Sequence, residues 1–148
     1  MKCALVREWM TPDPIVVSPE TTLPEAHRIM TENSIRHLPV VCEGQLVGIV
    51  TLGDIRGAEP SGATSLNIWE VNYLLSQLRV DEIMTPRPVT ISVDDTLGEA
   101  AQLMLKHRIG GLPVVDRHGA LAGIITECDI FRLVVEDWLQ EAEPAAGI

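Results

Sequence analysis

Short apolar runs and amphipathic segments alternate along this chain in an order that occurs twice. In each copy a run rich in β-branched residues comes first, an amphipathic segment follows, and two further apolar runs flank a glycine. Short runs of this kind predict strands, and apolar residues at three- and four-residue spacing predict a helix. A second helix follows the last strand, so the predicted order is β-α-β-β-α. The predicted strands cover residues 15–18, 38–41 and 46–50 in the first copy and 89–92, 112–115 and 121–125 in the second.

The helices are predicted by their apolar stripes and by their first turns. The stripes consist of Ala26, Ile29 and Met30 in the first copy and of Ala100, Leu103 and Met104 in the second. A Thr followed three positions later by Glu or Asp predicts a capping box, in which both side chains accept hydrogen bonds from amides of the first turn. The four pairs are Thr22 with Glu25, Thr96 with Glu99, Thr51 with Asp54, and Thr126 with Asp129. Pro39 and Pro113 lack an N–H, so we expect their strands to begin at, or lie on, a sheet edge.

The two copies are also alike residue by residue. The motif Met-Thr-Pro at residues 10–12 returns at 84–86, and 15 of the 32 residues in 10–41 are identical to their counterparts in 84–115. We expect each motif to form a Thr-Pro turn, and we place a one-residue insertion in the turn at Gly119. A long unit present only twice predicts two small domains related by a pseudo-twofold axis. The expected boundaries are 4–59 for repeat 1, 60–79 for a linker with a helix, 80–137 for repeat 2 and 138–148 for a C-terminal tail.

Two segments carry more apolar residues than a small core needs. In the linker, Ser65 is the expected helix cap, and one face is formed by Ile68, Val71, Leu75 and Leu78, with Trp69 and Tyr73 beside it. The last helix adds Phe131, Val134, Val135, Trp138 and Leu139 before a tail that we expect to be disordered. Packing within the chain and a surface for a partner protein are both open interpretations of these residues.

Composition narrows the class of protein. Hydrophobic residues make up 46% of the 148 residues but aromatic residues only 3%, so the core must be aliphatic. A net charge of −10 argues against a nucleic-acid or anionic-membrane surface. The three cysteines show no metal-ligand spacing and no leader precedes them, so we expect free thiols in a reducing cytoplasm. No apolar run is long enough to span a bilayer.

Candidate chemistry lies where the last strand of each copy meets its helix. The segments ending in Thr51 and Thr126 present amide groups and a hydroxyl at the positive end of a helix, which suits a phosphate or a hydroxyl group. Asp54 and Asp129, one turn later, can accept hydrogen bonds from two ribose hydroxyls. Capping alone also explains Thr and Asp at this spacing. No zinc pattern, phosphate-binding P-loop or nucleophile elbow is present in the sequence, so we expect no catalytic or metal site.

The Met-Thr-Pro openings, the Leu-Pro-Val-Val strands and the Gly-Ile-Val-Thr-x-x-Asp-Ile ending together resemble the cystathionine β-synthase (CBS) domain. Two tandem copies are similar to a CBS pair, or Bateman module, over about residues 4 to 135. The resemblance implies an α/β fold of the α+β type, in which two β-α-β-β-α repeats pack as a pair. It also implies clefts between the repeats that take adenosine-containing ligands, and disc-shaped homodimers.

The resemblance assigns roles to particular residues. It implies that Asp54 and Asp129 hold the ribose and that Thr51 and Thr126 contact ribose or phosphate. It places the base against Ile15 and Val17 in one copy and against Val89 and Ile91 in the other. Arg36 and His37 become candidates for phosphate recognition, or they are an ordinary solvated strand entry. The second copy has Gly110 and Gly111 there, so we expect two unequal clefts, one of them suited to phosphate.

The leading hypothesis is a non-catalytic, cytoplasmic regulatory module without a required cofactor. It would bind AMP, ADP, ATP or S-adenosylmethionine and would signal occupancy through a homodimer to a regulated protein on another chain. The alternative hypothesis is a ligand-free interaction module that acts through the apolar linker and C-terminal helices. Neither hypothesis involves nucleic acid or a membrane.

Overall fold

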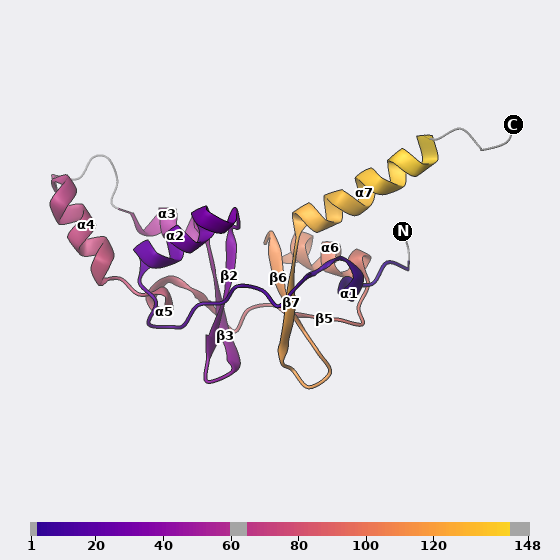
Figure 1. The fold of residues 1–148 in the computed structure, drawn as a ribbon, viewed down its shortest axis with the longest axis horizontal. Helices are drawn as coiled ribbons and strands as arrows, with labels where there is room; N and C mark the ends of the chain where they lie inside the picture. The colour runs from indigo at the N-terminus through magenta and orange to yellow at the C-terminus, as the bar shows by residue number, and fades with distance from the viewer. Residues whose placement is uncertain (1–2, 60–64, 143–148) are drawn as a thin grey trace, which may run out of the picture. The chain divides into compact units, whose positions relative to one another are not determined.

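The computed structural model describes residues 3–59 and 65–142, which fold into two compact units (Figure 1). The first-repeat unit is Pro14–Pro88, and the second-repeat unit combines Met1–Asp13 with Val89–Ile148. These units do not coincide with the repeats along the sequence. Each unit contains one β-α-β-β-α repeat together with the Met-Thr-Pro segment that opens the other repeat.

The first-repeat unit is built on a three-stranded antiparallel sheet of order β2-β3-β4. Helices α2 and α3 lie beside β2 and β3 (Figure 1), and α4 lies next to α2. Its elements are α2 (Leu23–Asn33), β2 (His37–Cys42), β3 (Gln45–Thr51), α3 (Leu52–Ala58), α4 (Ile68–Gln77), α5 (Val80–Ile83) and β4 (Thr85–Pro86). The core consists of buried aliphatic side chains, among them Leu23, Met30, Leu38, Val50 and Val80.

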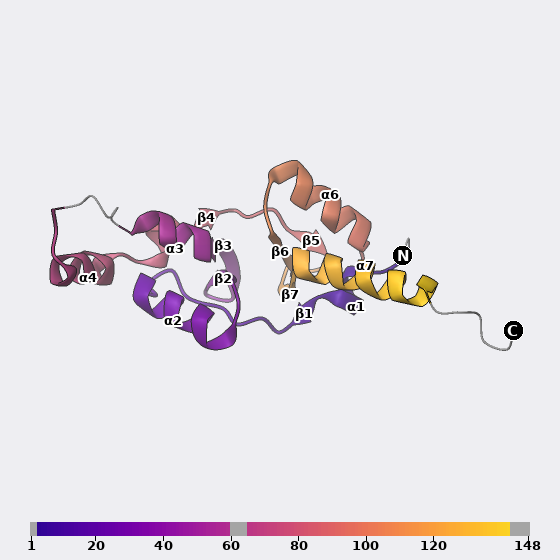
Figure 2. The same ribbon diagram turned by 90° about the horizontal axis from the view of Figure 1, so that it is seen from above.

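The second-repeat unit has a four-stranded sheet of order β1-β7-β6-β5, in which β5 and β6 run parallel. Helices α6 and α7 lie side by side, as the view from above shows (Figure 2). Its elements are α1 (Val6–Trp9), β1 (Thr11–Pro12), β5 (Ile91–Ser92), α6 (Leu97–His107), β6 (Gly111–Val115), β7 (Leu121–Thr126) and α7 (Glu127–Ala142). Its core repeats the first one, with Leu97, Met104, Leu112, Ile125 and Val6 in the matching positions.

The order α-β-β-α that follows the first strand is confirmed in both copies, but the first strands differ from expectation. In the first copy, residues 15–18 form only a single parallel bridge, between Val17 and Val40, while the second copy has the two-residue strand β5. The edge prediction holds for β2. β6 does not lie on an edge, since it has β7 and β5 on its two sides, but it begins at one, because Gly111 to Pro113 have no partner in β5. β5 pairs with Val114 and Val115 of β6. The missing N–H of Pro113 therefore leaves no gap in this pairing.

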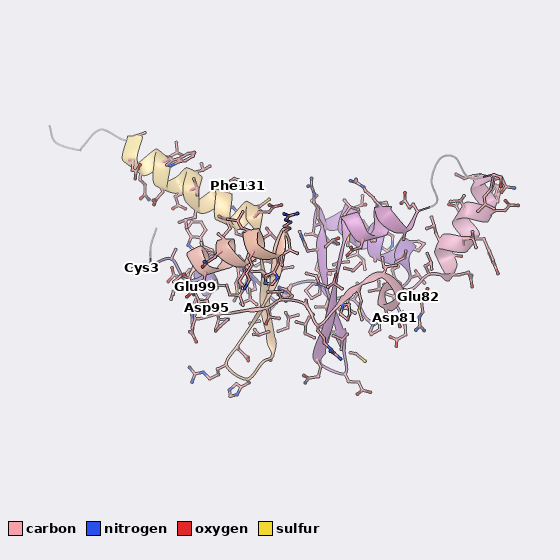
Figure 3. All side chains as sticks on the ribbon, turned by 180° about the vertical axis from the view of Figure 1, so that it is seen from behind. Cys3, Asp81, Glu82, Asp95, Glu99 and Phe131 are labelled. Carbon is pink, nitrogen blue, oxygen red and sulfur yellow. The ribbon has the colours of Figure 1, made fainter. Side chains whose placement is uncertain are left out.

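The capping boxes at Thr51 with Asp54 and at Thr96 with Glu99 are confirmed, and Glu99 and Asp95 flank the start of α6 in Figure 3. The box at Thr22 is wrong: the Thr22 side chain accepts no cap hydrogen bond. The carboxylate of Glu25 is turned toward Arg28 instead, at 3.8 Å from its guanidinium.

Two helix boundaries also need correction. The cap of α4 is Asn67, whose side chain and that of Glu70 form a capping box, and Ser65 lies outside the helix. At the other end, α7 continues through Ala142, so the first residues of the expected tail are helical. The remainder of that tail, and residues 60–64 of the expected linker loop, lie outside the described residues.

The Met-Thr-Pro segments form strands rather than turns, and they explain two glycines. Thr85 and Pro86 of β4 pair with Ile49 and Gly48, and β1 pairs with β7 at Gly123 in the same way. A Cβ on Gly48 would collide with the sulfur of Met84, and one on Gly123 would lie 2.7 Å from the Thr11 carbonyl oxygen. Glycine is needed at both positions because the paired strand and the methionine before it lie too close for a side chain.

Candidate functional site

In the first-repeat unit, Thr51 ends β3 and Asp54 lies in the first turn of α3. The Thr51 amide donates to Oδ2 of Asp54 at 2.9 Å, and the Asp54 amide donates to Oγ1 of Thr51 at 3.1 Å. Among the described residues, no hydrogen bond to Oδ1 of Asp54 accompanies these two. Both side chains are half-buried. The carboxylate is thus fixed in place by one oxygen and can still accept hydrogen bonds at the other.

The equivalent pair in the second-repeat unit is arranged differently. The Thr126 amide donates to Oδ2 of Asp129 at 2.9 Å, as in the first copy. Oδ1 of Asp129, however, accepts from Nη1 of Arg132 at 3.0 Å. The Asp129 residue is only 4% exposed, whereas the Arg132 side chain is 64% exposed. Both oxygens of this carboxylate therefore have a partner, and its charge is balanced by a guanidinium. In the first copy the residue three positions after Asp54 is Gly57.

The strand entries sit directly beside these junctions. The amide of Leu52 donates to the carbonyl oxygen of Arg36 at 2.9 Å, and the amide of Glu127 donates to that of Gly110 at 3.0 Å. Arg36 and Gly110 therefore occupy the same place in the two units, each tied to the first residue of the following helix. Arg36 and Glu127 are both exposed.

Glu127 fills the space that a side chain at position 110 would use. A Cβ built on Gly110 would lie 2.8 Å from Oε1 of Glu127. The space beside Gly110 is therefore occupied by Glu127. The φ of Gly110 is not in the left-handed region, so a turn conformation does not by itself require glycine there. The second junction therefore carries a carboxylate where the strand entry of the first carries the exposed Arg36.

His37 and Gly111 are the next residues along each chain segment. His37 is half-buried and pairs with Thr51 across β2 and β3, while the buried Gly111 pairs with Thr126. The structure thus brings Arg36, His37, Thr51 and Asp54 together at one junction. Thr126 and Asp129 lie at the other with Glu127 and Arg132.

The candidate base-contacting residues divide by burial. Val17 is 5% exposed and belongs to the first core, and Ile91 is 3% exposed and belongs to the second. The backbone of Val17 is also engaged, with its amide bonded to the Pro39 carbonyl at 3.1 Å. Ile15 is exposed and Val89 is half-buried, so only these two offer accessible aliphatic surface.

Sequence reasoning missed Glu127 and Arg132. A signal was present, because aligning the copies sets Leu52 against Glu127 and Gly57 against Arg132. Both differences replace a residue without charge by a charged one at the junction. Within the described residues, no group of three His, Cys, Asp or Glu side chains is arranged to hold a metal ion. Over the same part of the chain, every helix is too short or too polar to cross a bilayer.

Comparison with known proteins follows the same division into two repeats. The model of the CBS domain matches residues 6–61 and again residues 80–136. A protein of Methanocaldococcus jannaschii, MJ1225, is 35% identical over 135 residues, which are 86% of this chain. The chain spans only 46% of the length of that relative.

Two solved structures are similar over most of their length. The CBS domain pair of protein MJ0100, in complex with 5′-methylthioadenosine and S-adenosyl-L-methionine, is 33% identical with a TM-score of 0.73, over 88% of this chain and 99% of that one. CBSX2 in complex with AMP is 31% identical with a TM-score of 0.72, over 90% and 97% of the two chains. CBSX2 comes from Arabidopsis thaliana. With two matched repeats, the same fold and relatives of this identity, the chain belongs to the CBS domain family as a tandem CBS pair.

Proposed function

We propose that this protein is a non-catalytic regulatory module that binds an adenosine-containing ligand. The observation that carries the proposal is the Thr–Asp pair at the strand-to-helix junction of each unit, with its carboxylate oriented by the Thr amide. CBS domains are regulatory modules, and similar CBS pairs have been solved with AMP and with S-adenosylmethionine and 5′-methylthioadenosine. AMP, ADP, ATP and S-adenosylmethionine are therefore the ligands to test first.

The proposed contacts follow from the chemistry of each group. A ribose presents two adjacent hydroxyl donors, and the aspartate at each junction accepts from them. Thr51 and Thr126 contact the ribose or the 5′ substituent. The aliphatic surfaces of Ile15 and Val89 face the adenine, while the buried Val17 and Ile91 hold these segments against the cores. Arg36 and His37 serve a phosphate in the first repeat.

The repeat boundaries that we propose, 4–59 and 80–137, lie close to the two ranges matched by the family model. The compact units exchange the residues before Pro14 and before Val89. Binding residues of one repeat therefore depend on an opening segment that belongs, in sequence, to the other repeat.

Signalling is proposed to pass through a homodimer in the cytoplasm to a regulated protein on another chain. Its support is a set of exposed apolar side chains on α6 and α7, which include Leu105, Phe131, Val135 and Trp138 (Figure 3 labels Phe131). Leu105, Arg108 and Phe131 also line a hollow of about 390 Å³ between these helices. A ligand shifts such an assembly only by its difference in affinity for the two arrangements.

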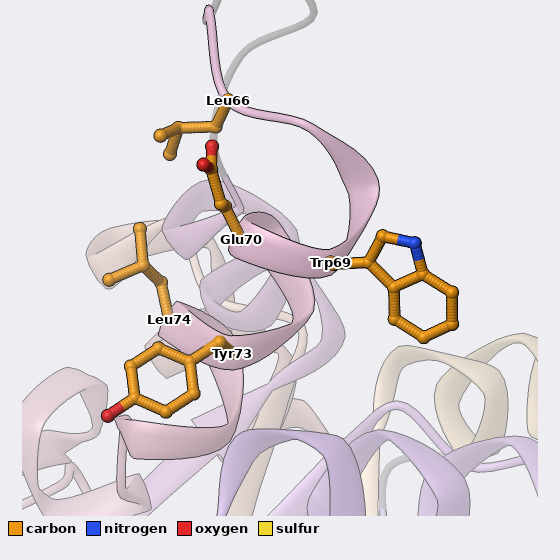
Figure 4. Close-up of a pocket in the computed structure, with 5 residues that line it drawn as sticks. All are labelled: Leu66, Trp69, Glu70, Tyr73 and Leu74. Carbon is orange, nitrogen blue, oxygen red and sulfur yellow. The ribbon is translucent and has the colours of Figure 1, made fainter.

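A second candidate function is a ligand-free interaction module. The observation that favours it is α4, in which no residue is buried. Trp69 is 80% and Tyr73 65% exposed, and they line a shallow hollow of about 380 Å³ with Leu66, Glu70 and Leu74 (Figure 4). This alternative predicts that adenosine ligands leave the protein unaffected.

A thermal-shift titration separates the two functions. We expect AMP, S-adenosylmethionine or 5′-methylthioadenosine to raise the melting temperature, since a ligand at about 100 times its Kd adds roughly 2.7 kcal/mol of stability. GMP is the matched control ligand. The double variant Asp54→Asn with Asp129→Asn keeps an oxygen for each cap and should abolish the shift, whereas Glu136→Gln on α7 should not.

Two outcomes contradict the proposal. Flat curves with every adenosine ligand, on folded protein, would favour the interaction module. A shift that survives the double aspartate substitution would place the ligand elsewhere. Light scattering with and without ligand then tests whether a dimer is present and whether it responds.

A further inference from the structure

The two junctions differ most in the charge beside the Thr–Asp pair, and we propose that this difference selects the ligand. The second-repeat junction binds an adenosine whose 5′ substituent carries no phosphate, while the first-repeat junction takes the phosphorylated form. This inference rests on the proposed function and adds a specificity residue, Glu127, to it.

The backbone at the two junctions is the same, so the side chains can be compared directly. Arg36 and Gly110 each accept, through their carbonyl oxygens, the amide of the residue that begins the next helix. In the first repeat that residue is Leu52, and in the second it is Glu127. The change from first to second repeat removes one cation and adds one anion at a matched place.

The Glu127 side chain occupies the space next to Gly110 that, in the first repeat, lies next to its counterpart Arg36. Its Oε1 lies where a Cβ on Gly110 would be in collision, at 2.8 Å, and its Cδ is 3.2 Å from the same point. A phosphate that used this strand entry, as we propose for Arg36, would meet a carboxylate in the second repeat. Like charges repel on close approach, whereas a neutral or cationic substituent meets no such penalty.

Two described cations, Arg132 and Arg108, lie near Glu127, and neither forms an ion pair with it. Arg132 is bonded to Asp129, which balances its charge. Arg108 lines the same hollow as Glu127 but forms no ion pair with it within 4.0 Å among the described residues. Glu127, Asp129 and Arg132 together carry one net negative charge, and Arg108 is the further cation of the same hollow.

Single-junction variants make the preference measurable. Asp54→Asn leaves the second junction intact, and Asp129→Asn leaves the first. By isothermal titration calorimetry we expect the Asp54→Asn protein to bind 5′-methylthioadenosine and S-adenosylmethionine at least about tenfold more tightly than AMP. The Asp129→Asn protein should show the reverse order for AMP and 5′-methylthioadenosine.

The deciding variant is Glu127→Gln in the Asp54→Asn background. It keeps the shape of the side chain and removes its charge, so AMP affinity should rise about tenfold while that for 5′-methylthioadenosine stays within twofold. Glu136→Gln, on the same helix and also exposed, is the matched control and should change neither.

The possible failures are distinct. A preference for AMP at the second junction, or an AMP to 5′-methylthioadenosine ratio unchanged by Glu127→Gln, would overturn this inference and leave the proposed function standing. Absence of binding by all three ligands in wild-type protein would overturn both.

Discussion

At the strand-to-helix junction, the first repeat carries Arg36 and Leu52 where the second carries Gly110 and Glu127. The hydrogen bond that joins each pair differs by only 0.1 Å between the two, at 2.9 and 3.0 Å. The aspartates receive the Thr amide at 2.9 Å in both. The two copies therefore share the backbone geometry of the junction but differ in the charges of its side chains. The shared backbone is what the fold requires, and the differing charges are what a bound ligand would contact.

The largest expected effect tests whether the cores of the two repeats contribute equally to stability. Leu38 and Leu112 occupy matched strand positions and are completely buried. Substitution of either by Ala should lower the free energy of unfolding by about 2–5 kcal/mol, because it leaves a cavity in a packed core. Urea denaturation followed by circular dichroism measures this, with the exposed Gln102→Ala as control. A high cost in one repeat and tolerance in the other would break the comparison.

The close pairing of the Met-Thr-Pro strands with Gly48 and Gly123 should give the next largest effect. Gly48→Ala and Gly123→Ala each place a methyl group against the neighbouring Met-Thr segment, so we expect each to lower the free energy of unfolding by about 1–3 kcal/mol. Gly57→Ala is the control, because its Cβ would meet nothing within 4 Å and alanine favours the helix by up to about 1 kcal/mol. Equal stability of Gly48→Ala and wild type in a thermal melt would show that β4 can move away.

A smaller effect should distinguish the two caps. Thr51→Ala removes the hydroxyl that accepts the Asp54 amide and should cost about 1 kcal/mol. The Thr126 hydroxyl instead lies 3.5 Å from the Asp129 carboxylate, so Thr126→Ala should cost less. Thr→Ser at each position restores a hydroxyl and is the control in the same chemical denaturation. Equal costs would mean that the junctions are capped alike in solution.

The smallest effect concerns the hairpin turns. The Asp116 carboxylate accepts hydrogen bonds from the amides of Ala120 and His118. These bonds, the one from Ala120 most of all, lower the pKa of Asp116 below its usual value of 3.8. Its stabilisation is therefore present above pH 3.8 and is lost as the pH falls below that value. Asp116→Asn should reduce the fall in melting temperature as the pH is lowered from about 4 to roughly 2. Glu43→Gln, in the other hairpin turn, should leave that dependence unchanged. Parallel curves for wild type and Asp116→Asn would contradict the assignment.

Much of the fold was predictable because the duplicated pattern states it twice. The order of elements and the boxes at Thr51 and Thr96 follow from local periodicity and local hydrogen bonding. Thr22 shows the limit of that reasoning: the Thr-x-x-Glu motif is the same, yet the Thr22 side chain accepts no cap hydrogen bond. The one-residue insertion does fall in the second hairpin: Val115 pairs with Leu121, whereas the matching pair in the first hairpin, Val41 with Leu46, lies one residue closer in sequence.

The candidate site was less predictable, because its charges depend on tertiary neighbours. The placement of Glu127 over Gly110 requires that the start of α7 and the entry of β6 lie together, which no local pattern states. The same holds for Gly48 and Gly123, because only the folded units show that a Met-Thr-Pro segment pairs closely with each of them.

The placement of those opening segments bears on how the two copies depend on each other. Each unit takes one strand and a short helix from the opening segment of the other repeat, so a single copy cut from the chain loses the strand on one edge of β3 or β7. Two identical single-copy chains could complete each other only by reciprocal domain swapping. In the present protein one covalent connection holds the two copies together, so this exchange does not depend on protein concentration.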